Sequence, residues 1–117
     1  MPNPVVHFEV IGKDGPALQR FYGDLFGWSI DADNPMNYGM VDNGGEGING
    51  GIGPAPEGGS GHVTFYVQVD DIKASLDKAK ELGGTPVFGP TEVPGGGPTI
   101  ALFNDPEGHL IGLVKGM

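Results

Sequence analysis

Two stretches of the chain decide its fold, and the first is VVHFEVIGKDGPALQRFYGDLFGW, residues 5–28. Its first six residues alternate between an apolar face and a face that carries His7 and Glu9, which is typical of a half-buried strand. Asp14 can then cap a helix whose apolar residues recur at three- and four-residue spacing, and Gly27 can end it. This segment therefore predicts a strand followed directly by a helix.

The second stretch is HVTFYVQVDDIKASLDKAKELGG, residues 62–84, and it repeats the first. It predicts a strand over 62–69 and then a helix that the pair Gly83-Gly84 ends. Shifting the sequence by 57 residues aligns seven identical pairs: Val6/Val63, Phe8/Phe65, Val10/Val67, Asp14/Asp71, Ala17/Ala74, Leu25/Leu82 and Gly27/Gly84. A shift of 61 residues aligns further pairs near the end of each half: Asn43/Asn104, Glu46/Glu107, Gly47/Gly108 and Gly51/Gly112. The chain thus contains an internal duplication.

Each half is predicted to have the order βαβββ, because short strand patterns follow each helix. These patterns cover residues 28–31, 38–42, 48–52, 85–88, 99–103 and 109–114. We expect one domain over residues 1–117, with a first module at about 4–53 and a second at about 61–116. The chain's 23 glycines and 11 prolines concentrate in segments 44–61 and 83–98, which predicts two long loops at the mouth of a binding site.

Composition narrows the classes of partner and compartment. The net charge of −9 repels nucleic acid and anionic membranes, and no apolar run is long enough to cross a membrane. The chain has no cysteine and no recognisable signal pattern, so we expect a cytoplasmic protein. Because a small core gains stability from association, we also expect a homodimer.

The motifs FYGDLFGW (21–28), HVTFYVQVDDI (62–72), ELGG (81–84) and NDPEGHLIGL (104–113) resemble the vicinal oxygen chelate superfamily of glyoxalase I, bleomycin-resistance proteins and extradiol dioxygenases. The resemblance covers nearly the whole chain. It implies an α+β fold in which two tandem βαβββ modules form an open eight-stranded cup, with the helices outside and the ligand inside. The activity is not implied, because the superfamily includes isomerases, lyases, dioxygenases and drug-binding proteins.

The same resemblance points to four positions at which metal-dependent members carry ligands: Val5, Gly51, His62 and Gly112. Three of these residues offer no side-chain donor, so we expect no metal cofactor. An alternative set of two histidines and one carboxylate, namely His7, Glu9 and His62, stays open as a divalent metal site, because His7 and Glu9 share one face of a strand.

The leading hypothesis is a metal-independent protein that binds a small molecule, cationic or aromatic, in the cup. The candidate ligand-binding residues are His7, Glu9, His62, Thr64, Tyr66, Gln68, Trp28 and Phe103. The alternative is a lyase, isomerase or dioxygenase that uses either a metal or no metal; in the metal-free case Glu9 or His7 would be the general base. A third interpretation is an assembly module with a vestigial cup.

Neither a dinucleotide-binding site nor a serine hydrolase site is supported by the sequence. The sequence GEGING at 45–50 matches a dinucleotide-binding pattern, but no helix pattern follows it. None of the serines stands at a sharp nucleophile turn, so serine hydrolase chemistry is unsupported. His109 is expected to be a surface or turn residue at the entry to the last strand, directly after the turn at 105–108.

Overall fold

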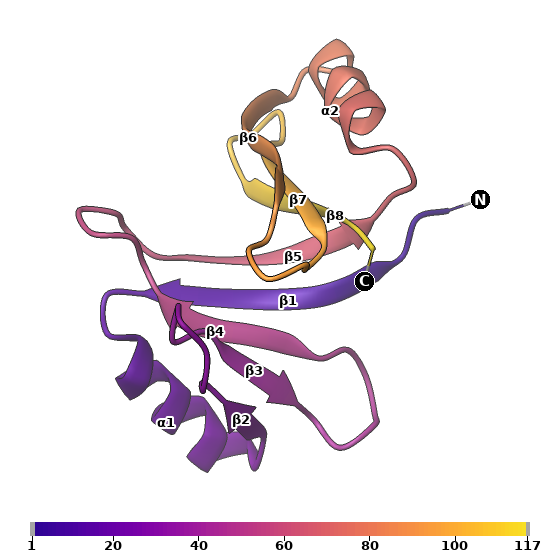
Figure 1. Cartoon of the computed structure of the whole chain (residues 1–117). Coiled ribbons are helices and arrows are strands. Elements are labelled where there is room, and N and C mark those ends of the chain that lie inside the picture. The colour runs from indigo at the N-terminus through magenta and orange to yellow at the C-terminus, as the bar shows by residue number, and fades with distance from the viewer. Residues whose placement is uncertain (1, 117) are drawn as a thin grey trace. The chain divides into compact units, whose positions relative to one another are not determined.

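The computed structural model describes residues 2–116, and over this range it contains eight strands and two helices in the predicted order. The elements are β1 Val5–Gly12, α1 Gly15–Phe26, β2 Ser29–Asp31, β3 Gly39–Asp42, β4 Gly50–Pro54, β5 His62–Gln68, α2 Ile72–Glu81, β6 Thr85–Glu92, β7 Thr99–Asn104 and β8 Leu110–Lys115 (Figure 1). The predicted α+β class and the repeated βαβββ order are confirmed. Neither described helix is long and apolar enough to span a membrane.

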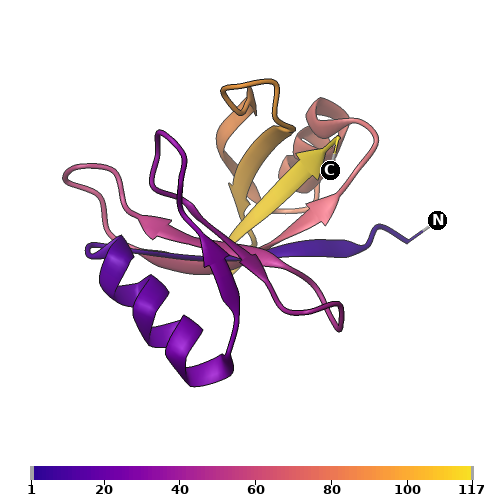
Figure 2. The same cartoon turned by 60° about the horizontal axis from the view of Figure 1, so that its bottom comes forward.

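The residues form two compact units. One is His7–Val63, and its strands lie in the order β2-β3-β4-β1. β1 and β4 are parallel, whereas β3 pairs with β4 and β2 with β3 in antiparallel fashion. α1 packs beside this sheet against β4 and β2 (Figure 2).

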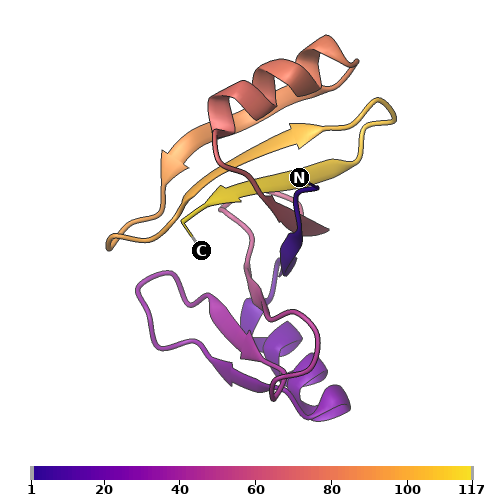
Figure 3. The ribbon, with the colours of Figure 1, turned by 90° about the vertical axis from the view of Figure 1, so that its right-hand side faces the viewer.

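The other unit contains the residues before His7 together with those from Thr64 onward. Its strands lie in the order β6-β7-β8-β5, with β5 and β8 parallel and the remaining pairs antiparallel. Figure 3 shows α2 lying alongside the strands of this sheet, and α2 contacts β6, β7 and β8. Both units thus have the same strand order and pairing, as the internal duplication predicts.

The helix ends follow the sequence signals. The side chain of Asp14 accepts a hydrogen bond of 3.0 Å from the backbone N–H of Ala17, and that of Asp71 accepts an equivalent bond of 3.0 Å from Ala74. Each bond satisfies a backbone donor that the first turn of a helix leaves without an intrahelical partner. Gly27 ends α1 in the left-handed conformation with φ 72°, which favours glycine because it has no Cβ.

Each of the two glycine- and proline-rich segments contains a strand, as the patterns at 48–52 and 85–88 predict, so the two loops are shorter than the segments themselves. β4 occupies Gly50–Pro54 inside the first segment, and β6 extends to Glu92 inside the second. The glycines of β4 are buried, and a Cβ at Gly50 or Gly51 would overlap an aromatic ring, that of Phe8 or Tyr38 respectively. These glycines allow close packing of side chains rather than a flexible loop.

Burial of the two faces of β1 and β5 differs from the expected pattern. The polar His7 and Glu9 are 8% and 9% exposed. In contrast, Val63 is 75% exposed and Phe65 is 40% exposed, although the strand predicted at 62–69 repeats the half-buried first strand and should bury its apolar face. The core beneath α2 consists of Val69, Ile72, Leu76, Ala101 and Leu113. It includes Val69, just beyond β5, but neither Val63 nor Phe65, so the expectation for those two residues is wrong.

Candidate functional site

The polar side chains of β1 form the centre of the candidate site. His7 and Glu9 are two residues apart on one strand, so their side chains leave the same face. Both are buried, and buried polar groups require hydrogen-bond partners. Their partners come from two other segments of the same compact unit, one at Tyr38 and one at His62.

Four side chains are joined by three hydrogen bonds. The Nε2 atom of His7 lies 2.8 Å from the hydroxyl of Tyr38, and that hydroxyl donates to Oε2 of Glu9 over 2.9 Å. The other carboxylate oxygen of Glu9 lies 2.7 Å from Nε2 of His62. We call His7, Tyr38, Glu9 and His62 the polar chain. It contains three of the eight residues that the sequence suggested for ligand binding.

The positions of the hydrogens follow from the number of donors in the polar chain. The hydroxyl of Tyr38 has one hydrogen and donates it to Glu9, so Nε2 of His7 must be the donor to Tyr38. With Glu9 as a carboxylate, Nε2 of His62 must likewise be a donor. Burial lowers the pKa of His7 below its ordinary value, and the nearby Glu9 opposes this shift only in part. His7 is therefore a neutral ring at pH 7, protonated on Nε2.

The ring of His62 is more accessible than that of the buried His7. The His62 side chain is 26% exposed, compared with 11% for Glu9. Because Nε2 of His62 faces the buried carboxylate, Nδ1 is the ring nitrogen that can accept a hydrogen bond from a ligand.

Tyr38 is the residue of this site whose role the sequence did not reveal. Asn34 fixes its backbone through two hydrogen bonds, one of 2.9 Å to the Tyr38 N–H and one of 2.7 Å from the Asn34 amide to the Tyr38 carbonyl. The Tyr38 ring then lies over Gly51, where a Cβ would overlap it. Gly51 is the direct neighbour of Glu9 in the pairing of β1 with β4. The Gly50-Gly51 pair was the available signal, because glycine in a strand often marks a close approach.

Three further candidate residues lie on β5 in the other compact unit. The hydroxyl of the buried Thr64 donates a short hydrogen bond to the backbone carbonyl of Leu110, so it stabilises the pairing region of β5 and β8. Tyr66 is 4% exposed and its ring lies over Gly112, again where a Cβ would overlap it. Gln68 is partly buried, and its backbone N–H donates to the carbonyl of Pro4 over 2.9 Å.

Trp28 and Phe103, the remaining candidates, do not belong to the polar chain. Trp28 packs in an aromatic cluster of the first module, with ring centroids 5.3 Å from Phe8 and 4.9 Å from Phe26. Phe103 packs against the core beneath α2. His109 lies in the turn after β7, as expected, and its Nδ1 is 3.0 Å from the carboxylate of Asp105.

The residues do not form the metal site that the family resemblance implies. Val5 has no donor atom, and the space beside Gly51 and Gly112 is filled by the rings of Tyr38 and Tyr66. His62 is the remaining position, and its Nε2 already contacts Glu9. In the alternative set, the hydroxyl of Tyr38 joins His7 to Glu9. Over residues 2–116, no three His, Cys, Asp or Glu side chains are placed to hold a metal ion.

Comparison with known sequences identifies relatives with glyoxalase-type names. A protein of Mycobacterium tuberculosis named "Putative glyoxylase CFP32" is 36% identical over 109 residues, which cover 86% of this chain and 41% of that protein. A "Probable lactoylglutathione lyase" of Vibrio cholerae is 37% identical over 68 residues, which cover 57% of this chain and 48% of that protein. The chain thus spans less than half the length of these relatives.

Comparison with solved structures supports the same fold. Methylmalonyl-CoA epimerase from Mycobacterium tuberculosis superposes with a TM-score of 0.69 at 16% identity, covering 97% of this chain and 87% of the epimerase. A 2,2',3-trihydroxybiphenyl 1,2-dioxygenase from Sphingomonas wittichii covers all of this chain with 42% of its own length, at a TM-score of 0.65 and 12% identity. At such identities the likeness concerns the fold alone.

The family assignment rests on the sequence as a whole. The model of the Glyoxalase/Bleomycin resistance protein/Dioxygenase superfamily matches residues 5–113, a range that runs from the first strand to the last. The repeated βαβββ order and the solved structures agree with this match. The chain therefore belongs to the Glyoxalase/Bleomycin resistance protein/Dioxygenase superfamily.

Proposed function

We propose that this chain binds a small organic molecule without a metal ion, and that the polar chain supplies polar contacts to it. His62 contributes an accessible ring nitrogen, and Glu9 contributes the charge that orients this ring. Members of one superfamily can lose a metal and keep a binding site, because function depends on the site rather than on the fold.

The observation that carries this proposal is the position of the Tyr38 ring over Gly51. A side chain at position 51 that could coordinate a metal ion would need the space that the Tyr38 ring occupies. In this chain that space holds a phenol, whose hydroxyl donates to Glu9. The carboxylate oxygen that could bind a cation is thereby used in a hydrogen bond.

The charge of the protein favours a neutral or cationic ligand. The formal net charge is −9, which repels anionic molecules at low ionic strength. Glu9 adds a negative charge at the site, whereas His7 stays neutral because burial lowers its pKa. An aromatic ligand would also suit the Tyr38 and His62 rings, because rings attract both aromatic faces and cations.

Isothermal titration of the metal-free protein with Zn²⁺, Ni²⁺ and Mn²⁺ tests the proposal. We expect no stoichiometric site with a dissociation constant below about 10 µM, a range in which sites with several protein donors normally bind. His109→Ala is the matched control, because His109 is an exposed histidine outside the polar chain and can bind metal weakly. One tight site per chain that is lost in His62→Ala but kept in His109→Ala would refute the proposal.

A second candidate function is metal-free acid–base catalysis, and the contact between His62 and Glu9 favours it. A carboxylate that holds Nε2 of an imidazole leaves Nδ1 as a general base. In this case His62 would take a proton from a bound carbonyl compound and return it to another atom, while Glu9 would orient the ring. Isomerisation of a hemithioacetal by the metal-free protein, lost in His62→Gln, would support this function. Absence of turnover of hemithioacetal and catechol substrates would contradict it.

We further propose a homodimer in the cytoplasm. Support comes from the exposed apolar residues of α1, where Phe21 is 58% and Leu25 is 59% exposed. Large exposed apolar patches on a small domain commonly mark an interaction surface.

A further inference from the structure

A cavity lies outside the polar chain, between α2 and the sheet of the second module. Its volume is about 390 Å³, within the range of small-molecule pockets. Its walls are mainly apolar and come from β5, β7, β8 and α2: Val67, Val69, Ala79, Leu82, Phe103 and Leu113. All of its lining residues belong to one compact unit.

The internal duplication explains why this cavity exists. The 57-residue shift that aligns Leu25 with Leu82 also pairs three bulky residues of the first module with small residues of the second: Leu18 with Ser75, Tyr22 with Ala79 and Trp28 with Thr85. Ser75 and Ala79 both line the cavity. At these equivalent positions on α2, the second module therefore lacks large side chains.

In the first module, aromatic rings occupy the corresponding region between helix and sheet. The rings of Tyr22 and Trp28 are stacked, with centroids 6.2 Å apart, and Trp28 lies 5.3 Å from the ring of Phe8 on β1. The equivalent of Phe8 is Phe65, which is 40% exposed. The two modules thus have the same backbone order, but one contains stacked rings where the other has an open cavity.

We propose that this cavity is a binding site for a small neutral aromatic molecule of one or two rings, which takes the place in the second module that the Tyr22 ring has in the first. The volume is sufficient, because apolar cavities of about 150 Å³ already bind benzene in proteins. Apart from Phe103, the apolar residues of the walls are aliphatic, and they match the apolar surface of such a ligand.

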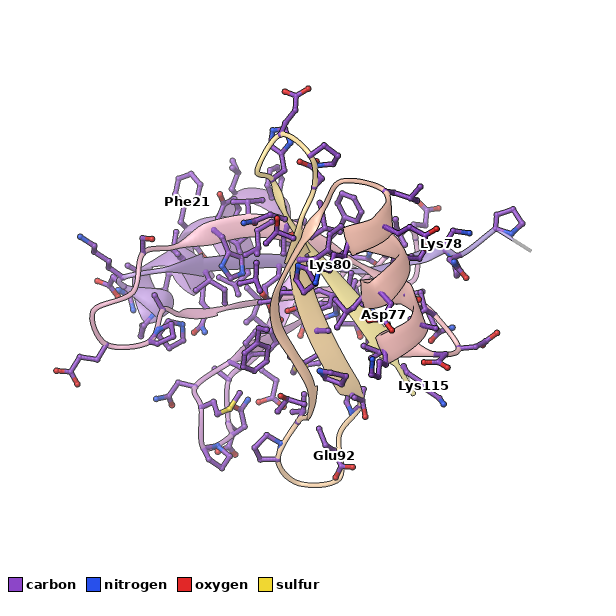
Figure 4. All side chains as sticks on the ribbon, turned by 90° about the horizontal axis from the view of Figure 1, so that it is seen from above. Phe21, Asp77, Lys78, Lys80, Glu92 and Lys115 are labelled. Atoms are coloured by element: carbon purple, nitrogen blue, oxygen red, sulfur yellow. The ribbon has the colours of Figure 1, made fainter. Side chains whose placement is uncertain are left out.

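The charged groups at the cavity favour a neutral ligand over an anion or a cation. Lys78, which projects from α2 in Figure 4, and Asp105 both line the cavity, so the two charges oppose each other. Asp105 accepts hydrogen bonds from the backbone N–H groups of Glu107 and His109, and these hold its carboxylate in place. A cation would lose hydration near Lys78, and an anion would lose hydration near Asp105, so either charge is unfavourable here.

Titration with indole, followed by amide chemical shifts of the isotope-labelled full chain, tests this site. We expect saturable shifts at the cavity walls with a dissociation constant of about 1 mM or lower, as is usual for a ligand of this size. Ala79→Tyr places the Tyr22 side chain at its equivalent position, and it should weaken indole binding by at least about tenfold. Ala74→Tyr is the matched control, because Ala74 lies on the same helix, is exposed and does not line the cavity.

A second filling variant keeps the test decisive if Ala79→Tyr does not fold. Ser75→Leu places a leucine at the position equivalent to Leu18, and it should also weaken the binding of indole. Circular dichroism checks that each variant is folded. The proposal is overturned if indole causes no saturable shifts at the cavity walls up to 10 mM, or if both folded filling variants bind indole as the parent does. Tighter binding of phenylacetate or 2-phenylethylamine than of indole would overturn the assignment of a neutral ligand.

Discussion

Replacing Tyr38 by Phe removes a single oxygen atom from the polar chain. That hydroxyl accepts a hydrogen bond of 2.8 Å from His7 and donates one of 2.9 Å to Glu9, so the substitution takes one partner from each of two buried groups. A buried polar group that loses a hydrogen-bond partner costs about 1–3 kcal/mol of stability, and more if it is charged. Since water and side-chain adjustments recover part of this, we expect a loss of about 2 kcal/mol.

Thermal and urea unfolding, followed by circular dichroism, measure this loss. For a chain of this size, about 2 kcal/mol corresponds to a fall of roughly 8 °C in Tm. Tyr22→Phe is the matched control: Tyr22 is also partly buried, and its hydroxyl has no hydrogen bond in the described structure, so its removal should change stability by less than about 0.5 kcal/mol. Equal stability changes in the two variants would refute the role assigned to Tyr38.

A double-mutant cycle separates the network from a general packing effect. Tyr38→Phe and Glu9→Gln each disturb the same hydrogen bond, so their combined effect should be smaller than the sum of the single effects by about 1 kcal/mol or more. Strict additivity would show that the hydroxyl and the carboxylate do not interact in solution. Strict additivity would also remove the main support for a site in which hydrogen bonds from Tyr38 and His62 orient the carboxylate of Glu9.

Three further predictions follow from the same geometry. Because burial lowers the pKa of His7 below 6.5, the unfolded chain binds more protons than the folded chain between these two pKa values, so the free energy of unfolding should fall as pH drops below about 6.5. Unfolding curves from pH 8 to 5 should show a smaller fall in His7→Gln. Gly51→Ala should cost about 1–3 kcal/mol in denaturant titrations because its methyl group overlaps the Tyr38 ring, and Tyr38→Ala in the same chain should recover part of that cost. Light scattering should give twice the chain mass, and Leu25→Glu should reduce it to a monomer; a monomer in the parent chain would exclude the homodimer.

The sequence predicts the helices and most strands of this chain because their signals are local. Asp14 and Asp71 cap helices where an acceptor side chain precedes an apolar pattern, and Gly27 adopts the left-handed conformation that glycine favours. The same reasoning recovers the repeated βαβββ order, since the duplication compares the chain with itself. The capping signals depend on neighbours within a few residues, whereas the duplication depends on a comparison of segments 57 residues apart.

The sequence predicts less where packing between distant segments decides the outcome. In β4 the Gly50-Gly51 pair indicates that some group approaches closely, but it does not indicate that this group is the ring of Phe8 or Tyr38. Tyr38 reaches Glu9 across 29 residues of sequence, so only the folded chain shows that it completes the polar chain. Similarly, alternation along β5 predicts which residues share a face, but it does not predict that Val63 on that face is 75% exposed.

The packing around the glycines at positions 51 and 112 limits the substitution of a metal-coordinating side chain at either position. Neither residue has the positive φ that would require glycine for its backbone conformation. Each is instead covered by a tyrosine ring, that of Tyr38 or Tyr66, so space alone excludes a side chain. A carboxylate at position 51 would therefore need Tyr38 to become smaller at the same time, and the loss of Tyr38 would break the hydrogen bonds to His7 and Glu9. Because either change alone is unfavourable, the phenol and the glycine should be retained or lost together.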